Sequence, residues 1–188
     1  MTVEAEFLIK LDIGCGVVGS GDVNCDLYVN DAGHRMTGNA INTRRVKNFV
    51  SCDAQHLPFK DEAFDWVYSS HVIEHVDNPF AMLREMVRVA RIRVTVRCPH
   101  RLGERFFLKQ SPYHVNFFGA AWFGKAFRKL NCISIVDIIN YISFPNKFIT
   151  LLRLPYEMQI DALKCNSPEI SEIITRVGIE RAYEILRG

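Results

Sequence analysis

The sequence predicts an α/β fold with a doubly wound, mostly parallel sheet. Short apolar runs of strand length alternate with segments patterned as helices or turns, which is typical of a sheet that carries its helices on its faces. Gly14 and Gly16 directly follow the first apolar run. A glycine turn there lets the backbone leave the carboxyl end of a strand, where open parallel sheets bind ligands. The 188 residues suffice for one such domain.

The expected strands are apolar runs bounded by polar or glycine-rich segments, at residues 7–13, 23–29, 46–51, 64–69 and 92–98. A helix is expected over 79–90, because Asn78 can cap it and Pro79 suits its first turn. A second helix is expected over 119–130. Two further apolar runs, 133–144 and 148–154, predict a terminal hairpin around Pro145 and Asn146. Residues 100–118 between these elements are expected to form a long loop.

The first crossover is unusually short. Only residues 17–25 separate Gly16 from Asp26, which is expected to end the second strand. A crossover that includes a helix needs at least about 10–12 residues, and usually more. The first crossover helix is therefore expected to be missing or reduced to a single turn.

Two units are expected along the chain: a domain over residues 1–160 and a helical tail over 161–188. Ser167-Pro168-Glu169 predicts the start of a helix in the tail. The tail also carries an apolar stripe wider than a single contact needs. We therefore expect it to pack on the domain or on a partner subunit, and of these we favour a homodimer.

Composition restricts the classes of function. The formal net charge is only +2, which does not indicate nucleic-acid binding but does not exclude it. No apolar stretch approaches the about 20 residues that span a bilayer, and the first residues lack a signal-peptide pattern. The six cysteines form no C-x-x-C pair, so no metal site is expected. A cytoplasmic protein is the expectation.

Four motifs occur in a fixed order. Leu11 to Gly16 read LDIGCG, Asp26 ends the second run, Asp53 opens D-A-x-x-L-P-F, and Phe64 opens F-D-x-V ahead of Glu74-His75. This set resembles the small methyltransferase domain of the class I S-adenosylmethionine-dependent methyltransferases, in a branch with a shortened first crossover. The resemblance implies a Rossmann-like sheet, a C-terminal antiparallel strand pair, and S-adenosylmethionine as cofactor with S-adenosylhomocysteine as product.

The resemblance also implies cofactor-binding residues. The turn after the first strand would lie under the methionine moiety, Asp26 would bind both ribose hydroxyls, and Asp53 would bind the adenine amino group beside Ala54. The complete predicted set is Asp12, Gly14, Cys15, Gly16, Asp26, Leu27, Asp53, Ala54 and Ser69. A Rossmann dehydrogenase is disfavoured, because Val18 stands where a further glycine would be needed and Asp26 comes too soon.

The acceptor side is less clearly marked. His71 and His114 are the candidate catalytic bases, since histidine titrates near neutral pH. Glu74, His75 and Arg97 are placed on the substrate side, but Glu74 and His75 fit a structural role as well, and Arg97 fits an uncovered sheet face equally well. Cys98, which precedes a proline, is a minor candidate nucleophile.

The predicted function is methyl transfer from S-adenosylmethionine to an unidentified acceptor (EC 2.1.1.-), which could be a small molecule, a sugar or lipid precursor, or a protein. Amino-group methylation of nucleic-acid bases is disfavoured, because the sequence lacks its signature after the fourth strand. The alternative is a methyltransferase-like subunit that holds the cofactor, or has lost it, and acts as a scaffold.

Overall fold

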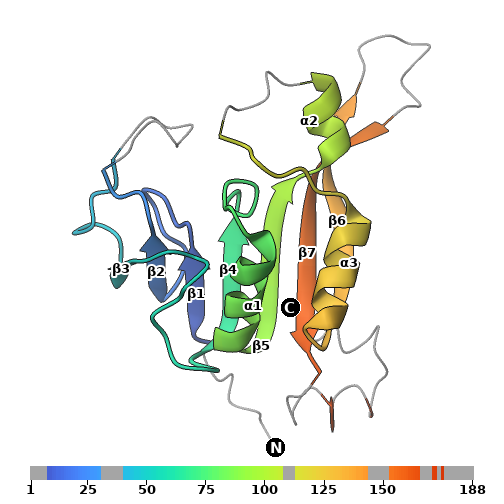
Figure 1. Ribbon diagram of the computed structural model, residues 1–188. Helices are drawn as coiled ribbons and strands as arrows, with labels where there is room; N and C mark the ends of the chain where they lie inside the picture. Colours follow the sequence, from blue (N-terminus) through green and yellow to red (C-terminus); the bar gives the residue numbers. More distant parts are fainter. Residues whose placement is uncertain are drawn as a thin grey trace, which may run out of the picture.

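The computed structural model has a seven-stranded sheet in the order β3-β2-β1-β4-β5-β7-β6 (Figure 1). It describes residues 8–30, 40–107, 113–143 and 153–165 together with residues 171, 172 and 175. All neighbouring strands pair in parallel except β7, which is antiparallel to both β5 and β6. The predicted mostly parallel sheet with a terminal antiparallel pair is therefore confirmed.

The first five strands lie where the apolar runs predict them, with some ends shifted. They are β1 (Lys10–Ile13), β2 (Val23–Asp26), β3 (Phe49–Ser51), β4 (Phe64–Ser70) and β5 (Ala90–Pro99). Leu11 pairs with Val23 on one side and with Val67 on the other, which places β1 in the centre of the parallel part. Central parallel strands are buried on their pairing edges and faces, so their apolar side chains form the core.

The connection from β1 to β2 contains no helix, as its length predicts. Residues 14–22 form turns, all of them within the described chain. Lys10 and Asp22 close this connection: the Asp22 amide donates to the Lys10 carbonyl at 2.8 Å, and the Lys10 amide donates to the Asp22 carboxylate at 3.0 Å. The Gly14 amide donates to the Cys25 carbonyl at 2.8 Å, so the glycine turn is tied to the end of β2.

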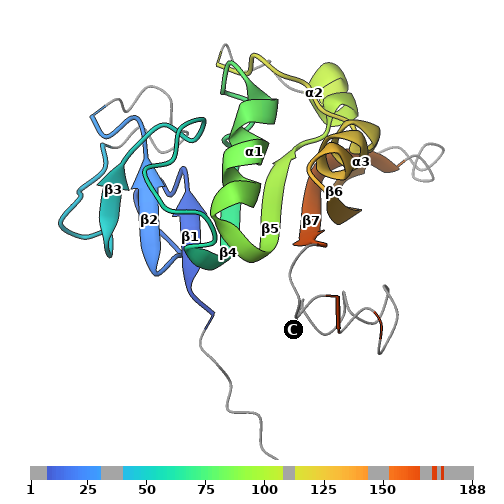
Figure 2. The same ribbon diagram turned by 60° about the horizontal axis from the view of Figure 1, so that its bottom comes forward.

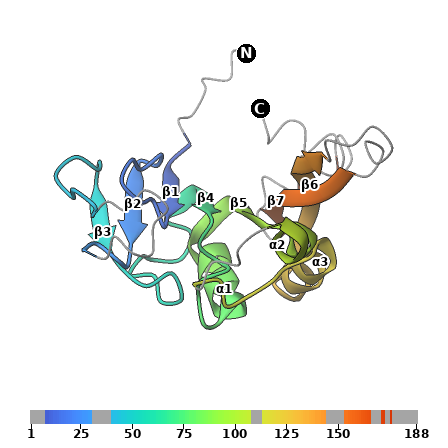
Figure 3. The ribbon, with the colours of Figure 1, turned by 90° about the horizontal axis from the view of Figure 1, so that it is seen from above.

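The described helices lie on one face of the sheet (Figure 3). They are α1 (Pro79–Val89), α2 (Arg101–Phe107) and α3 (Ala120–Lys129). The Asn78 side chain accepts a hydrogen bond from the Ala81 amide at 3.0 Å, which confirms the predicted cap of α1. Figure 2 shows α1 packed in front of β4 and β5, where its buried stripe meets the core.

The second strand of the terminal pair differs from its prediction. β6 (Cys132–Ser143) pairs with β7 (Arg153–Lys164), whereas the sequence pattern predicts the return strand at 148–154, of which residues 148–152 lie outside the described residues. The apolar run at 148–154 was the stronger strand signal, but β7 alternates buried residues such as Met158 and Ile160 with polar ones. The predicted boundary at residue 160 falls inside β7, and most of the predicted helical tail lies outside the described residues.

The sequence predicts a long loop over residues 100–118, but the structure has a helix in part of this segment. α2 forms there and packs on β7: a Cβ added to Gly103 would lie 2.8 Å from Cα of Tyr156. The His100 amide donates to the Tyr156 carbonyl at 2.7 Å, which attaches the start of α2 to the same strand. Charged and aromatic residues on α2 obscure its helical periodicity in the sequence.

The opposite face of the sheet is covered by no helix in the described residues. A shallow groove on that face is lined by long polar and aromatic side chains. The Lys10 ammonium lies 4.3 Å from the ring centres of both Trp66 and Tyr68, and the Arg93 guanidinium lies 4.0 Å from that of Trp66. Cation–π contacts of this kind let charged groups cover aromatic rings and remain hydrated.

Arg88 on α1 holds the segment that follows β3. Its guanidinium donates to the carbonyls of Leu57 and Phe59 and to the carboxylates of Asp61 and Glu85, at distances of 2.7–3.0 Å. Arg88 and the amide of Leu57, which donates to Glu85, lower the pKa of Glu85. The Glu85 carboxylate therefore contributes its full stabilisation at pH values above its ordinary pKa of 4.5. This contribution is lost as the pH falls through the lower pKa of the folded state.

We expect Arg88→Ala to lower the free energy of unfolding by about 1.5–3 kcal/mol, because carbonyl and carboxylate acceptors lose a charged donor. Denaturant unfolding at pH 7 measures the change. Arg84→Ala, which removes an exposed arginine from the same helix, is the matched control and should have little effect. Equal destabilisation by the two substitutions would show that Arg88 has no special role in holding the segment.

Candidate functional site

A cavity of about 260 Å³ opens at the carboxyl ends of β1, β2 and β4. Ligands bind at this edge in open α/β sheets. Six of the predicted cofactor residues line the cavity, namely Gly14, Gly16, Asp26, Leu27, Asp53 and Ala54. His71 and His75 line it as well. The structure therefore brings most of the predicted site residues together from distant parts of the chain.

Gly14 forms the floor of this cavity and requires the absence of a side chain. Its φ of +68° is in the left-handed region that side chains disfavour. A Cβ built there would lie 2.0 Å from Cγ2 of Val72, so any other residue would have to displace the Val72 side chain or the backbone that carries it. Gly16 also has a positive φ, of +59°, but a Cβ there would meet no atom within 4 Å.

Asp26 connects the glycine turn to the segment after β2. One carboxylate oxygen accepts a hydrogen bond from the Gly16 amide at 3.1 Å, and the other accepts one from the Tyr28 amide at 2.9 Å. These amides fix the carboxylate at the cavity wall. A carboxylate oxygen accepts more than one hydrogen bond, which suits the recognition of a pair of neighbouring hydroxyl groups.

Asp53 and Gln55 occupy the next wall, after β3. The Asp53 carboxylate accepts a hydrogen bond from the Gln55 amide at 2.8 Å. The Gln55 side-chain carbonyl accepts one from the Asn78 amide at 2.9 Å, which ties this wall to the start of α1. Ala54 is buried beside them. The polar groups of Asp53 and Gln55 therefore lie next to an apolar side chain, a combination that suits the binding of a planar base.

Six predicted residues do not line the cavity: Asp12, Cys15, Ser69, Glu74, Arg97 and His114. Asp12 is buried beneath the turn, where its carboxylate accepts hydrogen bonds from the amide and the hydroxyl of Ser20, both at 2.8 Å. Cys15 and Ser69 are not among the lining residues, and Ser69 is fully buried. Arg97 lies on the uncovered face, where its guanidinium donates to Gln159 at 2.7 Å. Asp12 therefore shapes the turn from outside the cavity.

His71 begins the acceptor-side wall and lies between two carboxylates. Its Nε2 is 3.1 Å from an oxygen of Glu157, and its Nδ1 is 3.3 Å from one of Glu74. The Glu74 carboxylate, supported by that of Glu157, raises the pKa of His71 against the opposing effect of burial. His71 also has a φ of +55°, an unfavourable backbone conformation of the kind that is common at functional sites.

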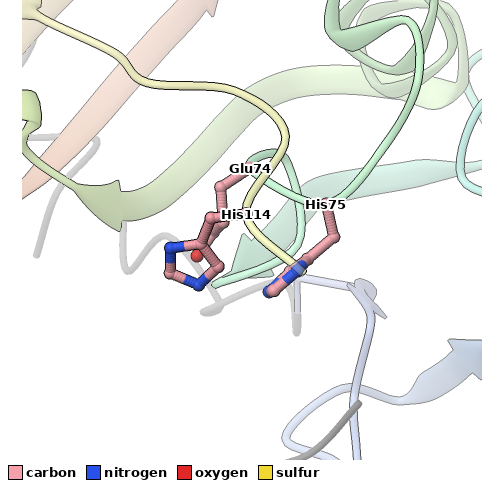
Figure 4. Close-up of side chains that lie close together, drawn as sticks. All are labelled: Glu74, His75 and His114. Atoms are coloured by element: carbon pink, nitrogen blue, oxygen red, sulfur yellow. The ribbon is translucent and has the colours of Figure 1, made fainter. Parts of the chain in front are cut away.

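Glu74, His75 and His114 form a cluster next to this wall (Figure 4). Glu74 and His75 follow β4, whereas His114 comes from the segment before α3, so the cluster joins two distant parts of the chain. Their ligating atoms all lie within 4.8 Å of one another. The rings of His75 and His114 pack edge to face, with centres 4.7 Å apart.

Cys98 is excluded as a nucleophile by its environment. The side chain is fully buried in β5, and burial raises the pKa of its thiol far above the ordinary value. A thiol reacts as the thiolate, which this environment strongly disfavours.

Sequence reasoning missed several residues of the cavity wall: Tyr28, Cys52, Gln55, Val72 and Asp77. Each lies within two residues of a strand end or a predicted site residue, so position along the chain could have identified them. Residue type could not, because Tyr28 and Val72 would fit a core position equally well.

Residues 11–96 match the family model described as a methyltransferase domain. The chain is 35% identical to norajmaline N-methyltransferase of Rauvolfia serpentina over 95 residues, which are 43% of this chain and 31% of that protein. It is 46% identical to demethylmenaquinone methyltransferase of Roseiflexus sp. (strain RS-1) over 50 residues, 27% of this chain and 21% of that protein. The match therefore spans about a third or less of the length of these curated relatives.

Solved structures share the fold over most of the chain. A methyltransferase from Thermotoga maritima aligns with a TM-score of 0.61 at 19% identity, over 86% of this chain and 84% of that one. One from Archaeoglobus fulgidus aligns with a TM-score of 0.62 at 17% identity, over 82% and 85%. Residues 11–96 therefore match the methyltransferase domain family, and the chain shares the fold of these solved methyltransferase structures.

Proposed function

We propose that this protein is an S-adenosylmethionine-dependent methyltransferase (EC 2.1.1.-). The observation that carries the proposal is the arrangement of Gly14, Asp26 and Asp53 around one cavity at the ends of three adjacent strands. The glycine turn allows the methionine part of the cofactor to approach the backbone closely. The fixed carboxylate of Asp26 suits the ribose, and the carboxylate of Asp53 beside an apolar wall suits the adenine.

The residues of the cavity would act mainly by binding and orientation. Asp26 would hold the ribose, Asp53 and Ala54 would hold the base, and Gly14 would allow the sulfonium end to approach the backbone. The bound cofactor supplies an electrophilic methyl group with a good leaving group, so proximity and alignment provide much of the acceleration. His71 would hold a proton between Glu74 and Glu157 on the acceptor side.

The acceptor is proposed to be a small molecule with a nitrogen or carbon nucleophile. The support is that similar proteins include norajmaline N-methyltransferase, demethylmenaquinone methyltransferase and a ubiquinone/menaquinone biosynthesis C-methyltransferase of Xylella fastidiosa.

None of the helices in the described residues has the length and apolar character of a membrane-spanning segment.

Calorimetry with S-adenosylhomocysteine tests the cofactor assignment. We expect saturable binding of one molecule per chain, followed by incorporation of label from S-[methyl-³H]adenosylmethionine into small-molecule fractions of a cell extract. Binding without transfer to any fraction would favour the scaffold alternative. The absence of both heat and thermal stabilisation would overturn the proposal.

We further propose a cytoplasmic homodimer. None of the six cysteines, all of which lie within the described residues, forms a disulfide bond, which suits a reducing compartment. The apolar stripe that the sequence predicts in the tail is wider than a single contact needs, which suits packing against a second copy. Sedimentation at micromolar concentration tests the assembly: a single species of 21.6 kDa would contradict the dimer.

A further inference from the structure

We propose that Glu74, His75 and His114 form a binding site for a divalent transition-metal ion of the zinc type. The cluster lies beside the cavity, and its members come from the segment after β4 and the segment before α3 (Figure 4). Two histidines and one glutamate are a ligand set that zinc accepts, with a fourth position left open. The proposal does not depend on methyl transfer.

Glu74 provides the first argument. The residue is only 1% exposed, yet neither carboxylate oxygen accepts a hydrogen bond from the part of the chain that the structure describes. His71 Nδ1 lies 3.3 Å from one oxygen, within ion-pair distance but without hydrogen-bond geometry. A buried carboxylate with unsatisfied oxygens is costly, and a bound cation would offset that cost directly.

The tautomer of His75 provides the second argument. Its Nδ1 lies 2.9 Å from the carbonyl oxygen of Tyr113. A carbonyl only accepts, so Nδ1 carries the proton and Nε2 of the neutral ring presents its lone pair. This is the arrangement in which a histidine ligates a metal while its other ring nitrogen is fixed by a backbone carbonyl.

His114 repeats the arrangement with a carboxylate. Its Nδ1 hydrogen-bonds to Glu104 of α2, which is only 2% exposed. A buried carboxylate that accepts from one ring nitrogen orients the ring and makes the other nitrogen a better ligand. Both histidines are thus held by acceptors outside the cluster, and neither needs the other's nitrogen as a hydrogen-bond partner.

The spacing of the cluster suits a metal ion after small side-chain rotations. The ligating atoms lie within 4.8 Å of one another, whereas tetrahedral zinc with bonds of about 2.0–2.1 Å places neighbouring ligand atoms about 3.3 Å apart. The sequence pattern could not indicate the site, because His114 is distant from the Glu74-His75 pair and no short ligand motif exists.

Titration of the tag-free protein of residues 1–188 with Co²⁺ tests the proposal. After removal of bound metal with a chelator, we expect about one equivalent of Co²⁺ to bind with visible absorption typical of nitrogen and oxygen ligands. His75→Ala and His114→Ala should abolish this band. Glu104→Gln should weaken binding by about 10–100-fold, since it alters only the group that orients His114.

His56→Ala is the matched control, because that side chain is 82% exposed and lies outside the cluster. It should bind Co²⁺ like the wild-type protein. Circular dichroism and thermal unfolding show whether each variant folds, and Glu74→Gln, which keeps the shape of the side chain, provides a second removal of a ligand. Absence of stoichiometric Co²⁺ binding by the wild-type protein, or equal binding by folded Glu74→Gln, His75→Ala and His114→Ala, would overturn the site.

Discussion

Replacing Gly14 with alanine is expected to lower the free energy of unfolding by about 2–5 kcal/mol and to abolish measurable binding of S-adenosylhomocysteine. A left-handed backbone costs a residue with a Cβ about 1–2 kcal/mol, and overpacking typically costs a further 1–3 kcal/mol. Here the new methyl group would overlap Cγ2 of Val72 at 2.0 Å. Relief of that overlap must move the Val72 side chain, the turn or the segment after β4, and all of these line the cavity.

Two further variants separate the causes. Gly16→Ala has the same backbone requirement but open space around its Cβ, so it should lose only about 1–2 kcal/mol. The double variant Gly14→Ala with Val72→Ala removes the overlapping atoms and should recover part of the stability. Equal effects of the two glycine substitutions, with no recovery in the double variant, would show that contact with Val72 is unimportant.

Asp26→Ala is expected to weaken binding of S-adenosylhomocysteine by about 10–100-fold. Hydrogen bonds to a charged group are worth about 1.5–3 kcal/mol, and each 1.4 kcal/mol is a factor of ten in affinity. The substitution would also release the amides of Gly16 and Tyr28, which the carboxylate now holds at the cavity wall. Calorimetry on the folded variant measures the change.

Asp22→Ala is the control for this measurement. Asp22 belongs to the same connection and also hydrogen-bonds a backbone amide, that of Lys10, but it does not line the cavity. We expect its loss to leave affinity unchanged. If Asp22→Ala weakens binding as much as Asp26→Ala, the carboxylate of Asp26 acts only by shaping the connection.

Most of the residues around the cavity could be predicted because the requirements of the glycine turn and the strand ends are local. A glycine that must adopt a positive φ, such as Gly14, and an acid at a strand end, such as Asp26, are recognisable from neighbouring residues alone. Asp12 belongs to the same motif, yet its side chain holds Ser20 rather than lining the cavity. A motif identifies the turn and does not distinguish residues that face the ligand from those that support the turn.

The rest of the site depends on contacts between distant segments. Glu104 and His114 meet only because α2 folds at the end of β5, and the sequence predicts a loop there. The return strand of the terminal pair was misplaced for a related reason: apolar content at 148–154 outweighed the alternation in β7, where pairing with both β5 and β6 decides the structure. Tertiary pairing overrides local preference in both cases.

The outward-facing side chains of β1, β4 and β5 and the short β1–β2 connection constrain each other. A helix placed over Lys10, Arg93 and Arg97 would have to bury three cations that now cover Trp66 and Tyr68 in contact with water. A chimera that takes a helical first crossover from another domain would therefore need matching apolar substitutions on those three strands. The connection and the strand pattern can be exchanged only as one unit.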